Sequence, residues 1–150
     1  MKLAEALMER ADLQRRMEQL GSRLRNNARV QEGEDPAEDP KELLKELTQV
    51  SAQLEEITTR INLTNSRALP AGETLTALLA RREVGQKKLE QLRSFLECAS
   101  RLIERGTRTE IKVVSTVNVR ELQKELDRES KALRELDATI QAANWTTELQ

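Results

Sequence analysis

The sequence predicts an all-α fold, specifically an elongated antiparallel four-helix bundle with coiled-coil-like packing. Four stretches carry apolar residues at alternating steps of three and four, the spacing that places side chains on one helix face. The second stretch is unbroken and reads Leu43, Leu47, Val50, Leu54, Ile57 and Ile61. Charged residues make up 34% of the chain and hydrophobic residues 37%, with one Trp, one Phe and no Tyr. This balance is typical of long solvated helices, because a narrow aliphatic seam needs no large rings.

The first two helices are predicted from Lys2 to about Asn27 and from Pro40 to about Asn65. Both stretches keep their apolar residues on one helix face. The start of the second helix is well marked, because Asp39 is a good N-cap, Pro40 suits the first helical position and Glu42 follows the cap by three residues. A pair of helices joined by one loop is therefore expected in the first half of the chain.

The third helix is predicted from about Glu73 to Arg105, with Gly106 as its C-terminal cap. The fourth is predicted to open at Asn118, where Glu121 follows three residues later as in a capping box. Its seam continues to Ala143. The second half of the chain should thus repeat the helix-connection-helix arrangement of the first half.

The two long connections differ in composition. Residues 28–39 form an acidic loop that contains proline and glycine, and a solvated loop is the expected structure. Residues 107–117 alternate β-branched with charged side chains and predict a strand-like connector. Because a lone strand leaves its backbone unpaired, we expect a two-stranded ladder of about 28–32 with 108–115, or pairing with another copy of the chain. Residues 1–150 are expected to form a single helical domain.

Composition excludes several classes of function. The chain has 25 Lys plus Arg against 26 Asp plus Glu, so no basic field favours nucleic acid. The absence of His excludes Ser-His-Asp and Cys-His catalysis and zinc sites built from Cys and His. No cofactor is expected, and neither a signal peptide nor a membrane-spanning segment is recognised. The lone Cys98 favours a cytoplasmic location, where thiols stay reduced.

Three charged residues interrupt three of the predicted seams: Arg10, Arg82 and Glu129. A charge at a core position must pair or is costly, and Glu129 is available to either arginine. Two interpretations follow. The charges specify the register of the helices, as buried polar residues do in coiled coils, or they line a site for an anionic ligand between the helices.

Several phrases of the sequence resemble a known family. They occupy residues 7–14, 27–36 and 61–65 and the terminal Asn144-Trp145. Taken in order, they resemble the septicolysin-like family of small bacterial helical proteins. The resemblance places further residues in recurring phrases, either as members of a polar or ligand site together with the seam charges or as a packing motif: Arg10, Asp12, Asn27, Asn62, Asn65 and Trp145.

The leading functional expectation is a soluble, non-enzymatic structural or interaction protein that self-associates, with Ile111, Val113 and Trp145 near the contact. A membrane-active, pore-forming protein is the alternative that the resemblance implies, although no constitutive membrane insertion is expected. A third class is a nucleotide-processing enzyme that uses carboxylates and arginine. Glu9 and Asp12 give one E-x-x-D pair for it, but the matching second motif is missing. The identity of any small-molecule ligand is left open.

Overall fold

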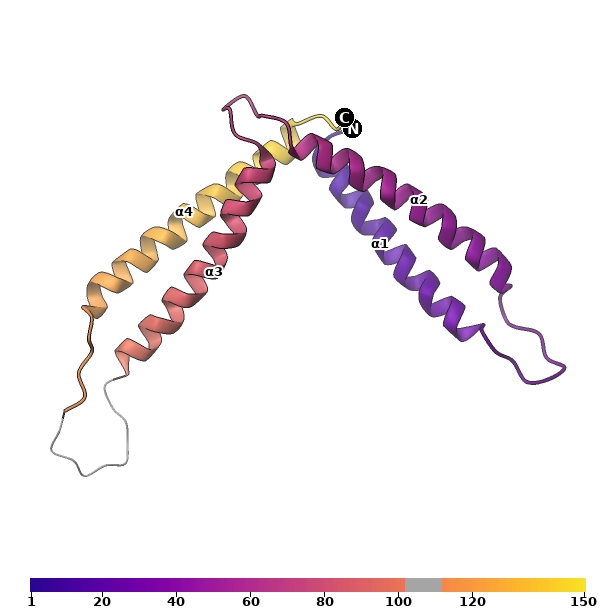
Figure 1. The fold of residues 1–150 in the computed structure, drawn as a ribbon, viewed down its shortest axis with the longest axis horizontal. Coiled ribbons are helices and arrows are strands. Elements are labelled where there is room, and N and C mark those ends of the chain that lie inside the picture. Colours follow the sequence, from indigo (N-terminus) through magenta and orange to yellow (C-terminus); the bar gives the residue numbers. More distant parts are fainter. Residues whose placement is uncertain (102–111) are drawn as a thin grey trace. The chain divides into compact units, whose positions relative to one another are not determined.

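The computed structural model describes residues 1–101 and 112–150, and within them the regular structure is helical. The helices are α1 (Leu3–Asn26), α2 (Pro40–Asn65), α3 (Leu75–Ser100) and α4 (Val119–Thr146). They pack as antiparallel pairs, α1 beside α2 and α3 beside α4 (Figure 1). The prediction of an all-α chain with four long helices is confirmed. The sequence predicts one four-helix bundle, and the structure shows two antiparallel pairs of helices.

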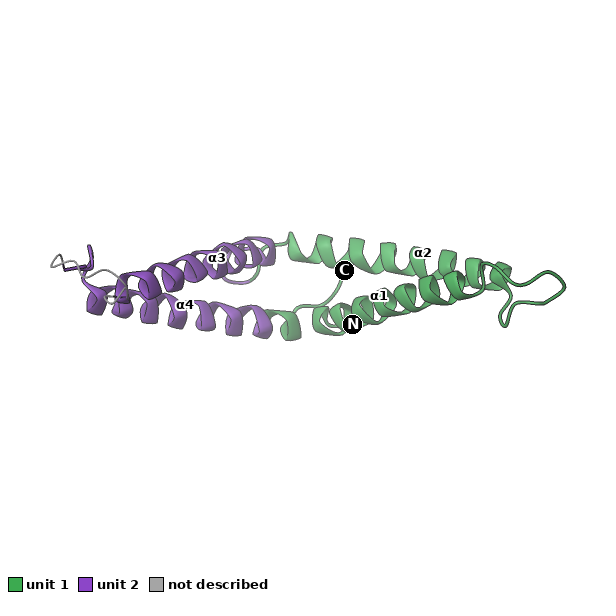
Figure 2. Ribbon diagram, turned by 90° about the horizontal axis from the view of Figure 1, so that it is seen from below, with its two compact units in different colours: residues 1–69, 143–150 green, residues 70–142 purple. Residues whose placement is uncertain are grey.

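The chain divides into two compact units (Figure 2). Unit 1 comprises Met1–Leu69 and Ala143–Gln150, so it holds the α1–α2 pair and the end of α4. Unit 2 comprises Pro70–Ala142 and holds the α3–α4 pair.

Side-chain caps fix the starts of three helices. The Asp39 carboxylate accepts a hydrogen bond from the Lys41 amide at 3.0 Å, so the predicted cap of α2 is confirmed. The Asn118 side chain accepts from the Glu121 amide at 3.1 Å at the start of α4, again as predicted. At α3 the cap is Thr74, whose hydroxyl accepts from the Ala77 amide at 3.1 Å, and the helix therefore begins at Leu75.

The predicted two-stranded ladder of residues 28–32 with 108–115 is wrong where the structure describes it. Residues 28–32 and 112–117 form no strand, and the remainder of the predicted strand, including Ile111, lies outside the described residues. The physical reason is a contact between the loop and the end of α1. The loop of residues 28–39 is fastened back to the end of α1 through Glu38, so its backbone does not depend on a partner strand.

An extended pairing does occur, but between the two ends of the chain within unit 1. Lys2 and Glu148 form an isolated antiparallel bridge. Beside it the Leu3 amide donates to the Thr147 carbonyl at 2.9 Å and the Leu149 amide donates to the Met1 carbonyl at 2.9 Å. The sequence shows no β-branched alternation at these positions, so this pairing was not predicted.

The core of unit 1 is a cluster of Leu20, Leu43 and Val50, against which Leu13, Leu24 and Leu47 pack while remaining partly exposed. Further along α2, Ile57 and Ile61 are buried as the unbroken seam predicts. In unit 2 the buried apolar side chains are Leu75, Leu78, Leu89, Leu126 and Ile140. Among the described helices, none is at once long and apolar enough to cross a membrane.

Candidate functional site

The seam charges of unit 2 form two ion pairs across α3 and α4. The Arg82 guanidinium lies 2.8 Å from the Asp137 carboxylate, and the Lys88 amine lies 2.9 Å from the Glu129 carboxylate. Glu129 thus pairs with Lys88, and not with Arg82. The hydrogen bond to Glu129 raises the pKa of Lys88. Because three of these four side chains are well exposed, the two pairs contribute little to stability.

A groove lies along each flank of the α3–α4 seam, and Leu133 lines both. The first groove, of about 310 Å³, is lined by Arg81, Gly85, Glu129, Ala132, Leu133 and Leu136. The second, of about 370 Å³, is lined by Gln86, Leu89, Arg93, Ser130, Leu133 and Arg134. Both volumes fall at the lower end of the range for small-molecule sites.

The helices approach each other closely at Gly85, which lines the first groove. A Cβ atom built on Gly85 would come within 3.2 Å of the Leu133 Cδ1 atom, which is tighter than an ordinary contact. The glycine therefore lets Leu133 pack closely against α3, and the lack of a side chain at Gly85 leaves space in the first groove.

Asn27 has a structural role in unit 1. It is 8% exposed, and its amide nitrogen donates to the Arg23 carbonyl at 2.8 Å, while its side-chain oxygen accepts from the Glu38 amide at 3.0 Å. The Glu38 carboxylate in turn pairs with the Arg23 guanidinium at 2.5 Å. This hydrogen bond lowers the pKa of Glu38. Asn27 thus joins the end of α1 to the acidic loop, which is a sufficient reason for its burial.

The other predicted polar residues of unit 1 lie apart from Asn27. Arg10 is half-buried on α1, and Asp12 forms an exposed ion pair with Arg15 one turn along the same helix. Asn62 is exposed on α2 with its carbonyl accepting from the Ser66 amide at 3.1 Å, and Asn65 is half-buried at the end of α2. Arg82 and Glu129 belong to unit 2. Of the predicted interface residues, Val113 is 57% exposed and Trp145 is 56% exposed.

Sequence reasoning missed a cluster that holds the last residue of the chain. The Arg60 guanidinium donates to the Gln150 carbonyl at 2.5 Å, and the Thr64 hydroxyl accepts from the Gln150 amide at 3.1 Å. Thr64 is 3% exposed, although Thr at a seam position ordinarily suggests a solvated site. Its place in register with Ile57 and Ile61 was the one available signal.

The described residues contain no group of three or more His, Cys, Asp or Glu side chains arranged to hold a metal ion. Cys98 is exposed and has no disulfide partner.

The fold and its grooves define an all-α protein built from antiparallel helix pairs. A family model matches residues 10–149 and is described as a family of unknown function, DUF6847, and the chain belongs to this family. The chain is also similar to a solved structure described as a functionally unknown conserved protein from Corynebacterium diphtheriae. That likeness has 40% sequence identity and a TM-score of 0.88, and it covers 100% of this chain and 99% of the other.

No curated protein matches the chain. The resemblance noted in the sequence predicted an uncharacterised helical family with bacterial members, and this coarser description agrees with the matches. Neither matched description mentions a cytolysin.

Proposed function

We propose that the chain is a non-enzymatic interaction protein that self-associates through the open apolar face of its α1–α2 pair. We define this open face by Leu13, Met17, Leu24 and Leu47. Three of these leucines pack against the unit 1 core yet stay partly exposed, and Met17 is 36% exposed. Two helices alone enclose a seam from two sides only, so a second copy of the face would complete the core.

The observation that carries this proposal is the amount of surface that the chain exposes. A compact monomer of 17.1 kDa would expose about 7,800 Å², and two separate compact globules of half that mass would together expose about 9,400 Å². The chain exposes 11,555 Å². Part of this excess belongs to the loops and to the outer sides of the helices, and the part that supports self-association is the apolar surface of the open face.

Two further features support an interaction role. Large apolar side chains outside the open face are also exposed, among them Val113 and Trp145, which are candidates for a second contact. The exposed free thiol of Cys98 supports a cytoplasmic location, because an oxidising compartment would favour its modification or cross-linking.

The test compares two glutamate substitutions on α1. Met17→Glu places a charge in the open face, and Met8→Glu places the same charge nine residues away, about half a turn around the helix, at a methionine that is 53% exposed. We expect Met17→Glu to dissociate the assembly and Met8→Glu to leave it intact. Molar mass is measured by light scattering at tens of micromolar protein, with circular dichroism as the check on folding.

If the wild-type protein elutes at 17.1 kDa, the proposal is wrong. If the wild type self-associates and Met17→Glu and Met8→Glu both remain associated, the open face is not the contact. Trp145→Ala then tests the second candidate region, where loss of association would move the interface to the end of α4.

A further inference from the structure

The two grooves of the α3–α4 pair differ in their charges. In the first groove Arg81 pairs with Glu73 at 2.5 Å and Glu129 pairs with Lys88 at 2.9 Å, so its ionised side chains are balanced. The second groove is lined by two arginines, Arg93 and Arg134, and by no carboxylate. Neither arginine has an ion-pair or hydrogen-bond partner among the described residues.

These two arginines come from facing helices. Arg93 lies one turn after the buried Leu89 on α3, and Arg134 follows Leu133 on α4, so both guanidinium groups border the same opening. A guanidinium presents its N–H donors in a planar fork that matches a carboxylate or a phosphate. The lining of this groove therefore brings together two guanidinium groups and no carboxylate, in a chain whose formal net charge is −1.

The remaining lining residues complete the chemical description of the groove. Gln86 offers an amide and Ser130 a hydroxyl, each able to donate a hydrogen bond to an oxyanion. Leu89 and Leu133 give the groove an apolar floor, and Leu89 is 5% exposed. Donors at the rim and an apolar floor fit a ligand that has an anionic head and a small apolar body.

We propose that the groove lined by Gln86, Leu89, Arg93, Ser130, Leu133 and Arg134 binds a small organic oxyanion, a phosphate monoester or carboxylate with an apolar substituent. Arg93 and Arg134 hold the anionic group, Ser130 and Gln86 orient it, and the leucines contact the substituent. This site lies within one helix pair, so it does not depend on self-association through α1 and α2.

The experiment titrates the full-length protein with phenyl phosphate and with inorganic phosphate and follows the arginine Nε–Hε resonances by NMR. We expect saturable shifts at Arg93 and Arg134, with phenyl phosphate binding more tightly than phosphate because of the leucine floor. Each of Arg93→Gln and Arg134→Gln should weaken phenyl phosphate binding about tenfold, as expected for loss of a charge-assisted contact. Binding should also weaken as salt is raised, because the groove is open to solvent.

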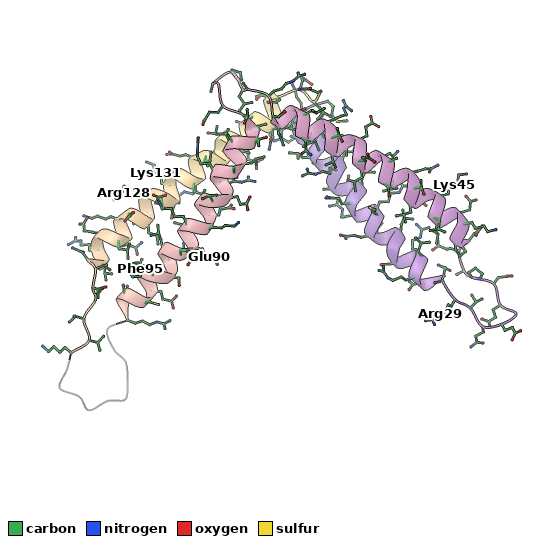
Figure 3. All side chains as sticks on the ribbon, viewed as in Figure 1. Arg29, Lys45, Glu90, Phe95, Arg128 and Lys131 are labelled. Atoms are coloured by element: carbon green, nitrogen blue, oxygen red, sulfur yellow. The ribbon has the colours of Figure 1, made fainter. Side chains whose placement is uncertain are left out.

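Arg128→Gln is the matched control. Arg128 is an exposed arginine on α4, the helix of Arg134, and it does not line the groove (Figure 3). The substitution removes the same charge and should leave the affinity unchanged. An equal loss of phenyl phosphate affinity in the Arg93, Arg134 and Arg128 variants would show that only general surface charge matters, and it would overturn the proposal. The absence of saturable shifts in the wild-type protein would overturn it as well. Equal affinity for phosphate and phenyl phosphate would refute the role of the apolar floor.

Discussion

Each of the two helix pairs of this chain consists of two long antiparallel helices, but the pairs differ in how many side chains they bury. The α1–α2 pair buries a long series of side chains: Leu3, Ala4, Ala6, Leu20, Leu43, Val50, Ile57, Ile61 and Thr64. In the α3–α4 pair the buried set is shorter, and grooves run on both flanks of the seam. The comparison teaches that an unbroken apolar seam such as that of α2 buries more side chains, whereas charged residues and a glycine within the seams of α3 and α4 leave fewer apolar side chains to bury.

The residues that make this difference can be named. In α3, Arg82 and Gly85 occupy seam positions between Leu78 and Leu89, and in α4 Glu129 occupies another. The charged residues extend to partners at the surface, and Gly85 supplies no side chain at all. Neither leaves an apolar group to fill the space beside Leu133.

The largest expected effect is the loss of stability when a buried side chain of the α1–α2 pair is truncated. Leu20→Ala should lower the free energy of unfolding of the α1–α2 pair by about 2–5 kcal/mol, because a fully buried side chain leaves a cavity that its neighbours cannot fill. Leu89→Ala in the α3–α4 pair should cost less, about 2 kcal/mol, since this side chain already borders an open groove. Urea unfolding followed by circular dichroism, at one fixed protein concentration, measures both. An equal or larger loss for Leu89→Ala would contradict the difference in packing.

A second effect tests the loop anchor of unit 1, in which Asn27 holds the Glu38 amide. Asn27→Ala leaves the Glu38 amide without its acceptor and should cost about 1–3 kcal/mol. Asn62→Ala, at an exposed position, is the control and should change stability by less than about 0.5 kcal/mol. Amide hydrogen exchange at Glu38 should accelerate only in the Asn27 variant. Unchanged exchange there would show that Asn27 does not hold the loop.

Alanine substitutions at the two helical glycines compare how closely the helices approach each other in the two pairs. Gly21→Ala in α1 should stabilise the protein by about 0.5–1 kcal/mol, because its Cβ would meet only the end of the Arg25 side chain at 3.4 Å. Gly85→Ala should gain less, since its Cβ would press on Leu133 at 3.2 Å. Thermal unfolding of the two variants side by side gives the difference. A larger gain at Gly85 than at Gly21 would mean that the helices of unit 2 do not approach closely there.

The smallest expected effect is on the melting temperature of the protein in acid. The Arg23 guanidinium holds the pKa of Glu38 below its ordinary value, so the pair contributes stability above about pH 4.3 and loses it as the pH falls through the lowered pKa. Glu38→Gln should therefore show a smaller fall in melting temperature between about pH 7 and about pH 3 than the wild type. Because both side chains are well exposed, the difference should be modest. An identical fall in both proteins would remove this pair from the acid response.

How far the sequence predicts this molecule depends on the range of the interactions involved. The seam of α2 and the caps at Asp39 and Asn118 were predictable, because they rest on spacing and on side chains a few residues apart. The ladder at residues 28–32 was wrong, since the Arg23–Glu38 contact that anchors the loop is a tertiary choice that strand propensity does not include.

The candidate site was less predictable than the fold. Arg82 and Glu129 were recognised as charges in a seam, but their partners Asp137 and Lys88 look like ordinary surface residues in the sequence. Arg93 and Arg134 carried no signal either. They become notable only because the two helices meet in the register that places both at one groove.

The most direct test of the central claim, that the open face of the α1–α2 pair is covered by a second copy, is the molar mass of the wild-type protein in solution. Light scattering at tens of micromolar protein should return at least twice 17.1 kDa, and Met17→Glu should return 17.1 kDa while Met8→Glu keeps the wild-type mass. A wild-type mass of 17.1 kDa under the same conditions would contradict the account.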